Sequence, residues 1–256
     1  MKNILYLILF SPLLFMCSCE KDIEGCTDTS AVNFNSDATQ NDDSCLFDSD
    51  GDGVNDSDEI LGCTIEVACN FNTNATDSDN DSCEYAATGF DCDGNITSYS
   101  IGMEVEGGII FYIDATGEHG LIASMEDLQP LAWGCMAMFI SGADGTSIGS
   151  GSQNSLDITS SCSQAPIAAG ACLAHENDGY ADWFLPSRDE LLEMYNTIGN
   201  GGPQGNVGNF QATSQSEYWS SSEFNEDYTW SVQFSNGNSF YDDKEFAYKV
   251  RPIRSF

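Results

Sequence analysis

The fold of the larger part of this chain follows from one stretch, GYADWFLPSRDEL at residues 179–191. Ser187 is followed three positions later by Glu190, and this spacing forms a capping box at the start of a helix. The predicted helix carries apolar residues on one face, at Leu191, Leu192, Tyr195 and Ile198. An amphipathic helix of this kind needs a core to pack against, so the stretch predicts a globular domain around it.

The sequence on both sides of this helix predicts strands and two further helices. Residues 107–113 (GGIIFYI) and 120–123 (GLIA) flank the turn 114–117 (DATG), as expected for a hairpin. After the helix, antiparallel strands are expected at 218–220, 229–234, 239–241 and 248–253, joined by Asn/Gly turns such as 236–238. Helical segments are expected at 154–162 and after Pro166. Residues 99–256 therefore form an α+β domain, which is long enough to bury a core.

The charge is strongly acidic and divides the chain into parts. The 256 residues include 7 Lys+Arg and 41 Asp+Glu, for a net charge of −34. Residues 20–98 hold 20 acidic residues and one base, Lys21, with few bulky apolar side chains, whereas residues 99–256 hold 21 acidic and five basic residues. Nucleic-acid binding is excluded, because affinity for phosphate backbones requires clustered Lys and Arg. Eleven cysteines indicate an oxidising compartment.

The first 18 residues have the features of a lipoprotein signal peptide. Lys2 precedes an apolar run at 4–16, which is too short to span a bilayer. Cys19 follows Ser18 and is the expected lipidated residue, with Cys17 as the alternative and an ordinary secretory signal as the competing interpretation. The acidic run 20–24 resembles the segment after the cysteine in surface-exposed lipoproteins of Gram-negative bacteria. We therefore expect a protein anchored by lipid in the outer membrane, facing outward.

Residues 19–98 form a predicted stalk with a duplicated cysteine unit. The repeats at 25–46 and 62–84 share the Gly-Cys-Thr start, the Asn-Phe-Asn centre and the Asp-Ser-Cys end. Their simplest pairing is Cys26 with Cys45, Cys63 with Cys83, and Cys69 with the trailing Cys92. Each bridge closes about 20 residues and should stabilise the stalk by roughly 3 kcal/mol. The unit resembles repeats in the stalks of large bacterial surface proteins; zinc binding is disfavoured because no Cys-x-x-Cys accompanies these cysteines.

A calcium-binding loop is predicted between the two repeats. DSDGDGVNDSDE at residues 48–59 matches the twelve-residue pattern with carboxylates at positions 1, 3, 5, 9 and 12 and glycine at position 6. The expected oxygen donors are Asp48, Asp50, Asp52, the Val54 carbonyl, Asp56 through water, and Glu59. The flanks are too short for EF-hand helices, so the loop resembles thrombospondin type 3 repeats. The alternative is a solvated acidic linker. Asp77, Asp79 and Asp81 repeat only the first half of the pattern and predict no second full site.

The head, residues 99–256, resembles the Lcl C-terminal domain family. The similarity rests on WGC at 133–135, the 179–191 stretch, YWSSSE at 218–223 and VRPIR at 250–254, and covers residues 101–256. It implies a C-type-lectin-like fold with a twisted antiparallel sheet and two or three helices. The adhesin for which the family is named binds sulfated glycosaminoglycans through basic residues. This head has five basic and 21 acidic residues, a net charge of −16, so we do not expect that ligand here.

The sequence gives no reason to expect an enzyme. His119 and His175 lack a nucleophile at a recognisable spacing and are expected as turn or surface residues. Cys135, Cys162 and Cys172 form an odd set whose pairing stays open, and a cysteine-oxidising enzyme of a related fold is the remote alternative. Asp182 is expected beside Arg188 or Arg251. The aromatic residues Tyr218, Trp219 and Trp230 suit either a core or a sugar-stacking platform.

Two functional hypotheses follow from these features. The first is a surface-anchored protein whose calcium-bound stalk presents a lectin-like head to an extracellular glycan or protein. The second is a structural protein of the cell envelope whose head packs on neighbouring molecules. An exposed group of Trp and Tyr beside acidic or amide side chains would favour the first, and a flat, self-complementary apolar face the second.

Overall fold

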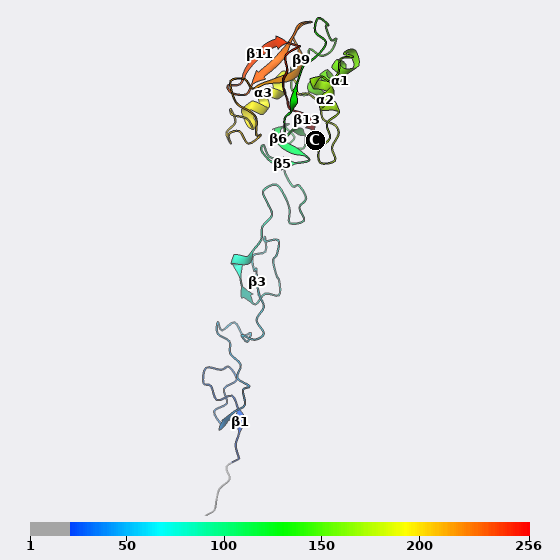
Figure 1. Ribbon diagram of the computed structural model, residues 1–256. Coiled ribbons are helices and arrows are strands. Elements are labelled where there is room, and N and C mark those ends of the chain that lie inside the picture. Colours follow the sequence, from blue (N-terminus) through cyan, green and yellow to red (C-terminus); the bar gives the residue numbers. More distant parts are fainter. Residues whose placement is uncertain (1–20) are drawn as a thin grey trace, which may run out of the picture. The chain divides into compact units, whose positions relative to one another are not determined.

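The computed structural model describes residues 21–256, which divide into two compact units after Ala86 (Figure 1). The predicted signal peptide and the lipidation candidates Cys17 and Cys19 lie outside the described residues. Residues 87–98, which the sequence suggests are stalk, belong to the second unit. There Thr97 N–H donates to the Gly89 carbonyl, and Tyr99 packs on Phe256 with ring centroids 4.4 Å apart. Within the described chain, no helix has the length and apolar character of a membrane span.

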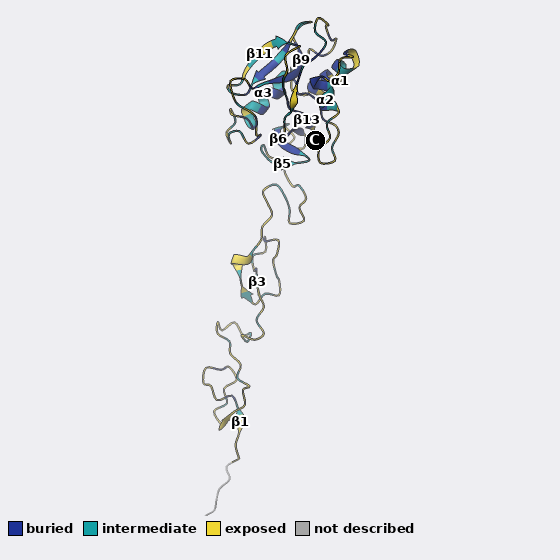
Figure 2. Ribbon diagram, viewed as in Figure 1, coloured by how far each residue is buried: buried dark blue, intermediate teal, exposed yellow. Residues whose placement is uncertain are grey.

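The two repeats of the first unit fold in the same way. Each holds a short parallel strand pair, β1 (Glu24–Gly25) with β2 (Gln40–Asn41) and β3 (Leu61–Gly62) with β4 (Asp77–Ser78). Asn33 bonds to the backbone of Ser44 and Leu46 as Asn70 bonds to that of Ser82 and Glu84. A 3-10 turn, η1 (Asn80–Ser82), follows in the second copy. Most of the chain here is exposed, so it has little core of its own (Figure 2).

Disulfides hold these repeats in place of a core. Cys26 is bonded to Cys45 and Cys63 to Cys83, which is the pairing expected from the duplicated spacing. Cys69 and Cys92 are also in disulfide form, and their pairing with each other stays a prediction. Cys26 and Cys63 are almost fully buried, so the small apolar centre of each repeat is built around a bridge.

The head, residues 99–256 within the second unit, contains two sheets. The first has the order β11 (Asn238–Asp243), β10 (Tyr228–Gln233), β9 (Glu217–Glu223), β12 (Tyr248–Val250) and β8 (Leu128–Leu131). The second has the order β13 (Ile253–Ser255), β7 (Gly120–Ser124), β6 (Gly108–Ile113) and β5 (Glu104–Val105). All pairs are antiparallel except β12 with β9, so the first sheet is mixed rather than purely antiparallel.

The predicted strand at 248–253 is divided between the two sheets. β12 ends at Val250 in the first sheet, and β13 begins at Ile253 in the second. Pro252 lacks the N–H that a continuous ladder would need. Arg251 between them is buried and donates through its guanidinium to the carbonyls of Ser124 and Gly208. The break therefore places a fully satisfied arginine at the crossing from one sheet to the other.

Three helices pack in the head: α1 (Gly151–Ser161), α2 (Ala168–Leu173) and α3 (Arg188–Thr197). The predicted capping box is present at α3, where Ser187 Oγ accepts from Glu190 N–H and Glu190 accepts from Ser187 N–H at 2.6 Å. Trp133, Trp183 and Trp219 are fully buried, and the indoles of Trp133 and Trp219 donate to the carbonyls of Ser220 and Leu131. The core thus lies between the sheets and the helices (Figure 2).

Candidate functional site

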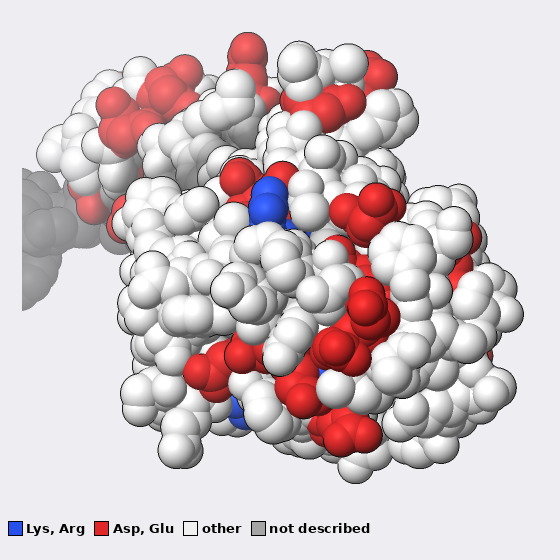
Figure 3. Space-filling model, turned by 90° about the horizontal axis from the view of Figure 1, so that it is seen from above, with Lys and Arg blue, Asp and Glu red and all other residues white. Residues whose placement is uncertain are grey.

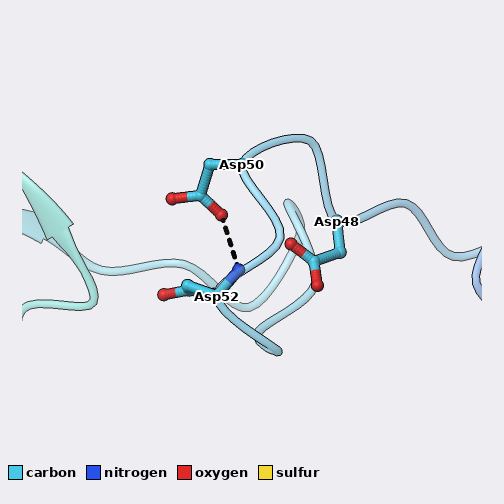
Figure 4. Close-up of side chains that lie close together, drawn as sticks. All are labelled: Asp48, Asp50 and Asp52. Atoms are coloured by element: carbon cyan, nitrogen blue, oxygen red, sulfur yellow. Dashed lines mark hydrogen bonds between the residues drawn. The ribbon is translucent and has the colours of Figure 1, made fainter.

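The predicted calcium loop gathers its first three carboxylates on one short bend (Figure 4). Oxygen atoms of Asp48, Asp50 and Asp52 lie within 4.8 Å of one another. Backbone N–H groups of the loop hold them there: Gly51 donates to Asp48 at 2.7 Å, Asp52 to Asp50 at 3.2 Å, and Val54 to Asp52 at 2.8 Å. Gly53 has φ +95°, the left-handed conformation that the sixth position of such a loop needs.

The closing carboxylate of the loop meets a residue of the second repeat. Asp50, Glu59 and Asp77 form another group with oxygens within 4.8 Å of one another, and Asp77 lies in β4. Asp77 is a candidate ligand that the loop pattern alone does not select, since it is 18 positions beyond Glu59. Asp79 and Asp81 belong to neither carboxylate group in the described part of the chain.

Crowding of negative charge perturbs Glu59. Partial desolvation, a hydrogen bond with Asp77, and the charges of Asp77, Asp56 and Asp50 together raise the pKa of Glu59 to about 7. Asp56, expected as a ligand through water, belongs to neither group in the described part of the chain, and its two oxygens accept from the backbone N–H and hydroxyl of Ser49 at 2.7 Å each. These bonds lower the pKa of Asp56. Asp56 therefore stays ionised within the loop without joining either carboxylate group.

The donor chemistry fits a hard divalent cation. Every candidate ligand side chain in the two groups is a carboxylate, the ligand type that calcium takes at 2.3–2.6 Å with six to eight oxygens. The groups share Asp50, so the loop and the second repeat offer neighbouring oxygens. A bound cation would offset the mutual repulsion that raises the pKa of Glu59.

A second feature is a group of aromatic side chains on the outside of the head, which we term the aromatic cluster: Phe224, Tyr228, Trp230 and Tyr241. Trp230 and Tyr241 are direct cross-strand partners, with ring centroids 6.0 Å apart. Phe224 stacks on Tyr241 at 4.7 Å with 14° between the planes, and meets Trp230 edge-on at 5.5 Å. Phe224, Tyr228 and Tyr241 are 47%, 39% and 56% exposed, in contrast to the three fully buried tryptophans.

The Lys244–Glu223 ion pair anchors the loops around the aromatic cluster. Both side chains are fully buried, and Lys244 Nζ donates to Glu223, to the Met138 carbonyl and to the Glu226 carbonyl. Glu223 also accepts from Ile140 N–H at 2.9 Å. The pair thereby joins the end of β9, the turn after it and the loop before Ile140. Desolvation raises the pKa of Glu223, partly offset by Lys244.

Few basic groups surround the aromatic cluster. The Arg188 guanidinium lies 5.0 Å from the Trp230 ring and forms an ion pair with Asp189 at 2.8 Å. On the face drawn in Figure 3, acidic side chains occur in several patches and exposed basic groups are few. The Arg188 cation beside the cluster is already paired and the head carries a net charge of −16, so the cluster is suited to a neutral or cationic ligand and unsuited to a sulfated one.

The structure separates the roles of Tyr218, Trp219 and Trp230. Tyr218 and Trp219 belong to the core, and their rings are fully buried. Trp230 is partly exposed and belongs to the aromatic cluster. Phe224, Tyr228 and Tyr241 were missed as site residues because alternation along a strand does not distinguish an exposed aromatic face from a buried one. The Glu-Phe-Asn-Glu-Asp turn at 223–227 offered the only sequence signal, an apolar residue between acidic ones.

The remaining candidates have structural surroundings. Asp182 pairs with Arg254 at 2.8 Å rather than with Arg188 or Arg251, because the antiparallel bridge between Phe184 and Ile253 brings the two segments side by side. Cys135 is bonded to Cys162, and Cys172 is a free, fully buried thiol whose pKa is raised by desolvation. A buried thiol with a raised pKa is a poor nucleophile. His175 packs edge-on to Trp183, with its buried Nε2 lacking a hydrogen-bond partner among the described residues.

Comparison with known proteins identifies the head. A search of curated protein sequences gives no match. Among solved structures, a fimbrial protein from Bacteroides ovatus aligns over 66% of this chain and 49% of its own length, with 14% identity and a TM-score of 0.39. The chain thus spans about half of that protein. The family model of the Lcl C-terminal domain matches residues 127–254, which is half of the chain and most of the head. The chain belongs to the Lcl C-terminal domain family.

Proposed function

We propose that this chain is a lipid-anchored cell-surface protein in which a calcium-bound stalk presents a lectin-like recognition or adhesion head. Family membership is consistent with a cell-surface protein. The single observation that supports recognition is the aromatic cluster, which places three exposed rings in mutual contact on the outside of the head. Exposed aromatic groups of this kind mark ligand or protein contacts, because leaving them in water is unfavourable. The lectin-like fold itself is part of the proposal.

The recognition role is tested with the full chain on glycan and extracellular-matrix protein arrays. We expect binding that is lost when Phe224, Tyr228 and Tyr241 are replaced together by serine. Leu156→Ser is the matched control, because Leu156 is an apolar residue that is 49% exposed and lies on helix α1, outside the sheet that carries the cluster. No binding to either array, or equal binding by both variants, would leave the structural envelope role as the better hypothesis.

The calcium role of the stalk rests on the two carboxylate groups that share Asp50. When bound, the ion would neutralise charge that otherwise makes the stalk repel itself. Asp48, Asp50, Asp52 and Glu59 would hold it, with Asp77 from the second repeat as an added ligand. Isothermal titration calorimetry of the full chain is expected to show heat of calcium binding that is abolished in Asp50→Ala and weakened in Asp77→Ala. Alanine is used because asparagine at position 3 of such a loop can itself bind calcium. Asp58→Ala is the matched control, because Asp58 is an acidic loop residue that belongs to neither group. If the unaltered chain showed no heat of calcium binding, this role would be contradicted.

Lipid anchoring at Cys19 is the third part of the proposal. Bacteria that express the chain are grown with an alkyne fatty acid, and we expect the protein to become labelled. Cys19→Ala should abolish labelling, whereas Cys17→Ala should keep it. The reverse pattern would move the anchor to Cys17, and no labelling in the unaltered chain would indicate an ordinary secretory signal.

A further inference from the structure

Strand β11 is an open edge of the first sheet of the head. It pairs with β10 over six residues in unbroken register, from Asn238 opposite Gln233 to Asp243 opposite Tyr228. The described part of the chain places no strand on its other side. In an antiparallel strand about half of the backbone N–H and C=O groups point away from the partner. β11 therefore presents a row of backbone hydrogen-bonding groups without a strand partner.

The other sheet edges of the head carry features that discourage pairing, and β11 lacks them. β8, at the opposite edge of the same sheet, contains Pro130, which has no N–H to donate. In the second sheet, β5 is two residues long and β13 three. β11 contains no proline or lysine and no bulge against β10. Long, regular edges without such features are templates for another strand.

The side chains of β11 offer an aromatic ring on each face. Tyr241 lies on the face of the aromatic cluster, beside Trp230 and Phe224. Phe240 points to the opposite face and is 42% exposed. Because side chains alternate along an added strand, an incoming segment would place successive residues next to each of these rings. The edge thus combines free backbone groups with apolar contacts on both sides.

The charge of this edge selects the partner. Asp242 and Asp243 end the strand, and Glu245 follows it. The nearest bases are engaged, since Lys244 is buried against Glu223 and Arg188 pairs with Asp189. A second copy of this head, with a net charge of −16, would meet repulsion. We propose that β11 accepts an extended, lysine- or arginine-rich segment of another polypeptide as an added strand. This inference rests on the proposed recognition function and names its partner class.

The test uses the full chain and three synthetic ten-residue peptides. The first alternates lysine with threonine and valine, and the second replaces each lysine by glutamate. The third is the lysine peptide with an N-methyl group on every residue, which removes the N–H donors from both of its edges. Hydrogen exchange of the 238–243 amides and fluorescence anisotropy are measured together. We expect the lysine peptide to bind and to slow exchange at β11 at least tenfold. The other two peptides should do neither, because one has the wrong charge and the other cannot complete the ladder.

A variant series then locates the contact. Phe240→Thr with Tyr241→Thr should weaken binding of the lysine peptide at least fivefold while keeping β propensity, and Leu156→Thr on α1 should leave binding unchanged. The inference would be overturned if no peptide bound, or if the methylated peptide bound as well as the lysine peptide. It would also be overturned if slowed hydrogen exchange lay away from β11, or if the chain dimerised through β11 with increasing concentration. The chain could also bind a glycan or matrix protein on the arrays through Phe224 and Tyr228 while the lysine peptide fails to bind. That result would overturn the inference and leave the proposed function intact.

Discussion

Removing the buried cation at Lys244 should strongly destabilise the head. In Lys244→Met the Glu223 carboxylate keeps only the Ile140 N–H, and the Met138 and Glu226 carbonyls lose their donor. Removing one partner of a buried ion pair costs about 3–5 kcal/mol, because the other charge stays buried without compensation. We expect a loss of about that size in the free energy of unfolding.

The assay for this loss is urea unfolding followed by tryptophan fluorescence. All four tryptophans lie in the head, so the signal reports on the head alone. Lys249→Met, in the neighbouring strand β12, is the matched control and should change the free energy by less than about 0.5 kcal/mol. The loss in Lys244→Met should shrink toward acidic pH, because desolvation already raises the pKa of Glu223 and protonation removes the uncompensated charge. A loss below about 1 kcal/mol, or an equal loss in the control, would refute the assignment of the ion pair as a structural anchor.

Three further predictions concern the stability of the head and are checked by the same unfolding assay. Replacing Cys135 and Cys162 together by serine should lower the free energy of unfolding by about 3.5 kcal/mol, because the disulfide joins residues 27 positions apart and restricts the unfolded chain. An unchanged free energy of unfolding would contradict this role of the disulfide. Ser187→Ala should lose about 1–2 kcal/mol through the missing cap of α3, and the exposed Ser163→Ala should be neutral; equal losses would contradict the capping role. Arg254 lowers the pKa of Asp182, so the stabilisation by this pair is present above about pH 4 and is lost as the pH falls through the lowered pKa. Asp182→Asn should therefore be less stable than the unaltered chain at pH 7, by under about 1 kcal/mol because Asp182 is half exposed. A difference in the free energy of unfolding that grew as the pH fell would contradict this pH dependence.

Local patterns in the sequence predict the elements of the head whose signals lie within a few residues. The hairpin around 114–117 and the capped helix after Ser187 are present because turn chemistry and capping act over short distances. The strand β8 was missed, because Leu128–Leu131 contains a proline and becomes a strand only through pairing with β12. The break at Pro252 was missed for a related reason: the chain changes sheets there, and that depends on distant partners.

The candidate site shows the same division. The spacing of Asp48, Asp50 and Asp52 is a local property, and the structure brings their oxygens together. Asp77 joins Glu59 only because the second repeat folds back on itself in the β3–β4 pair, and the loop pattern carries no information about that pairing. The aromatic cluster likewise requires three segments, the turn at Phe224 and the strands β10 and β11. Nothing in the sequence sets its members apart from other aromatic residues of the head, and only the fold brings their rings together.

We claim that the head is displayed on the outside of the cell. The decisive experiment labels intact bacteria that carry the protein with an antibody against the head, before and after treatment with a protease that cannot cross the envelope. We predict strong labelling that the protease removes. Labelling that appears only after the cells are permeabilised, or recovery of the chain in the cytosol with its cysteines reduced, would contradict the claim.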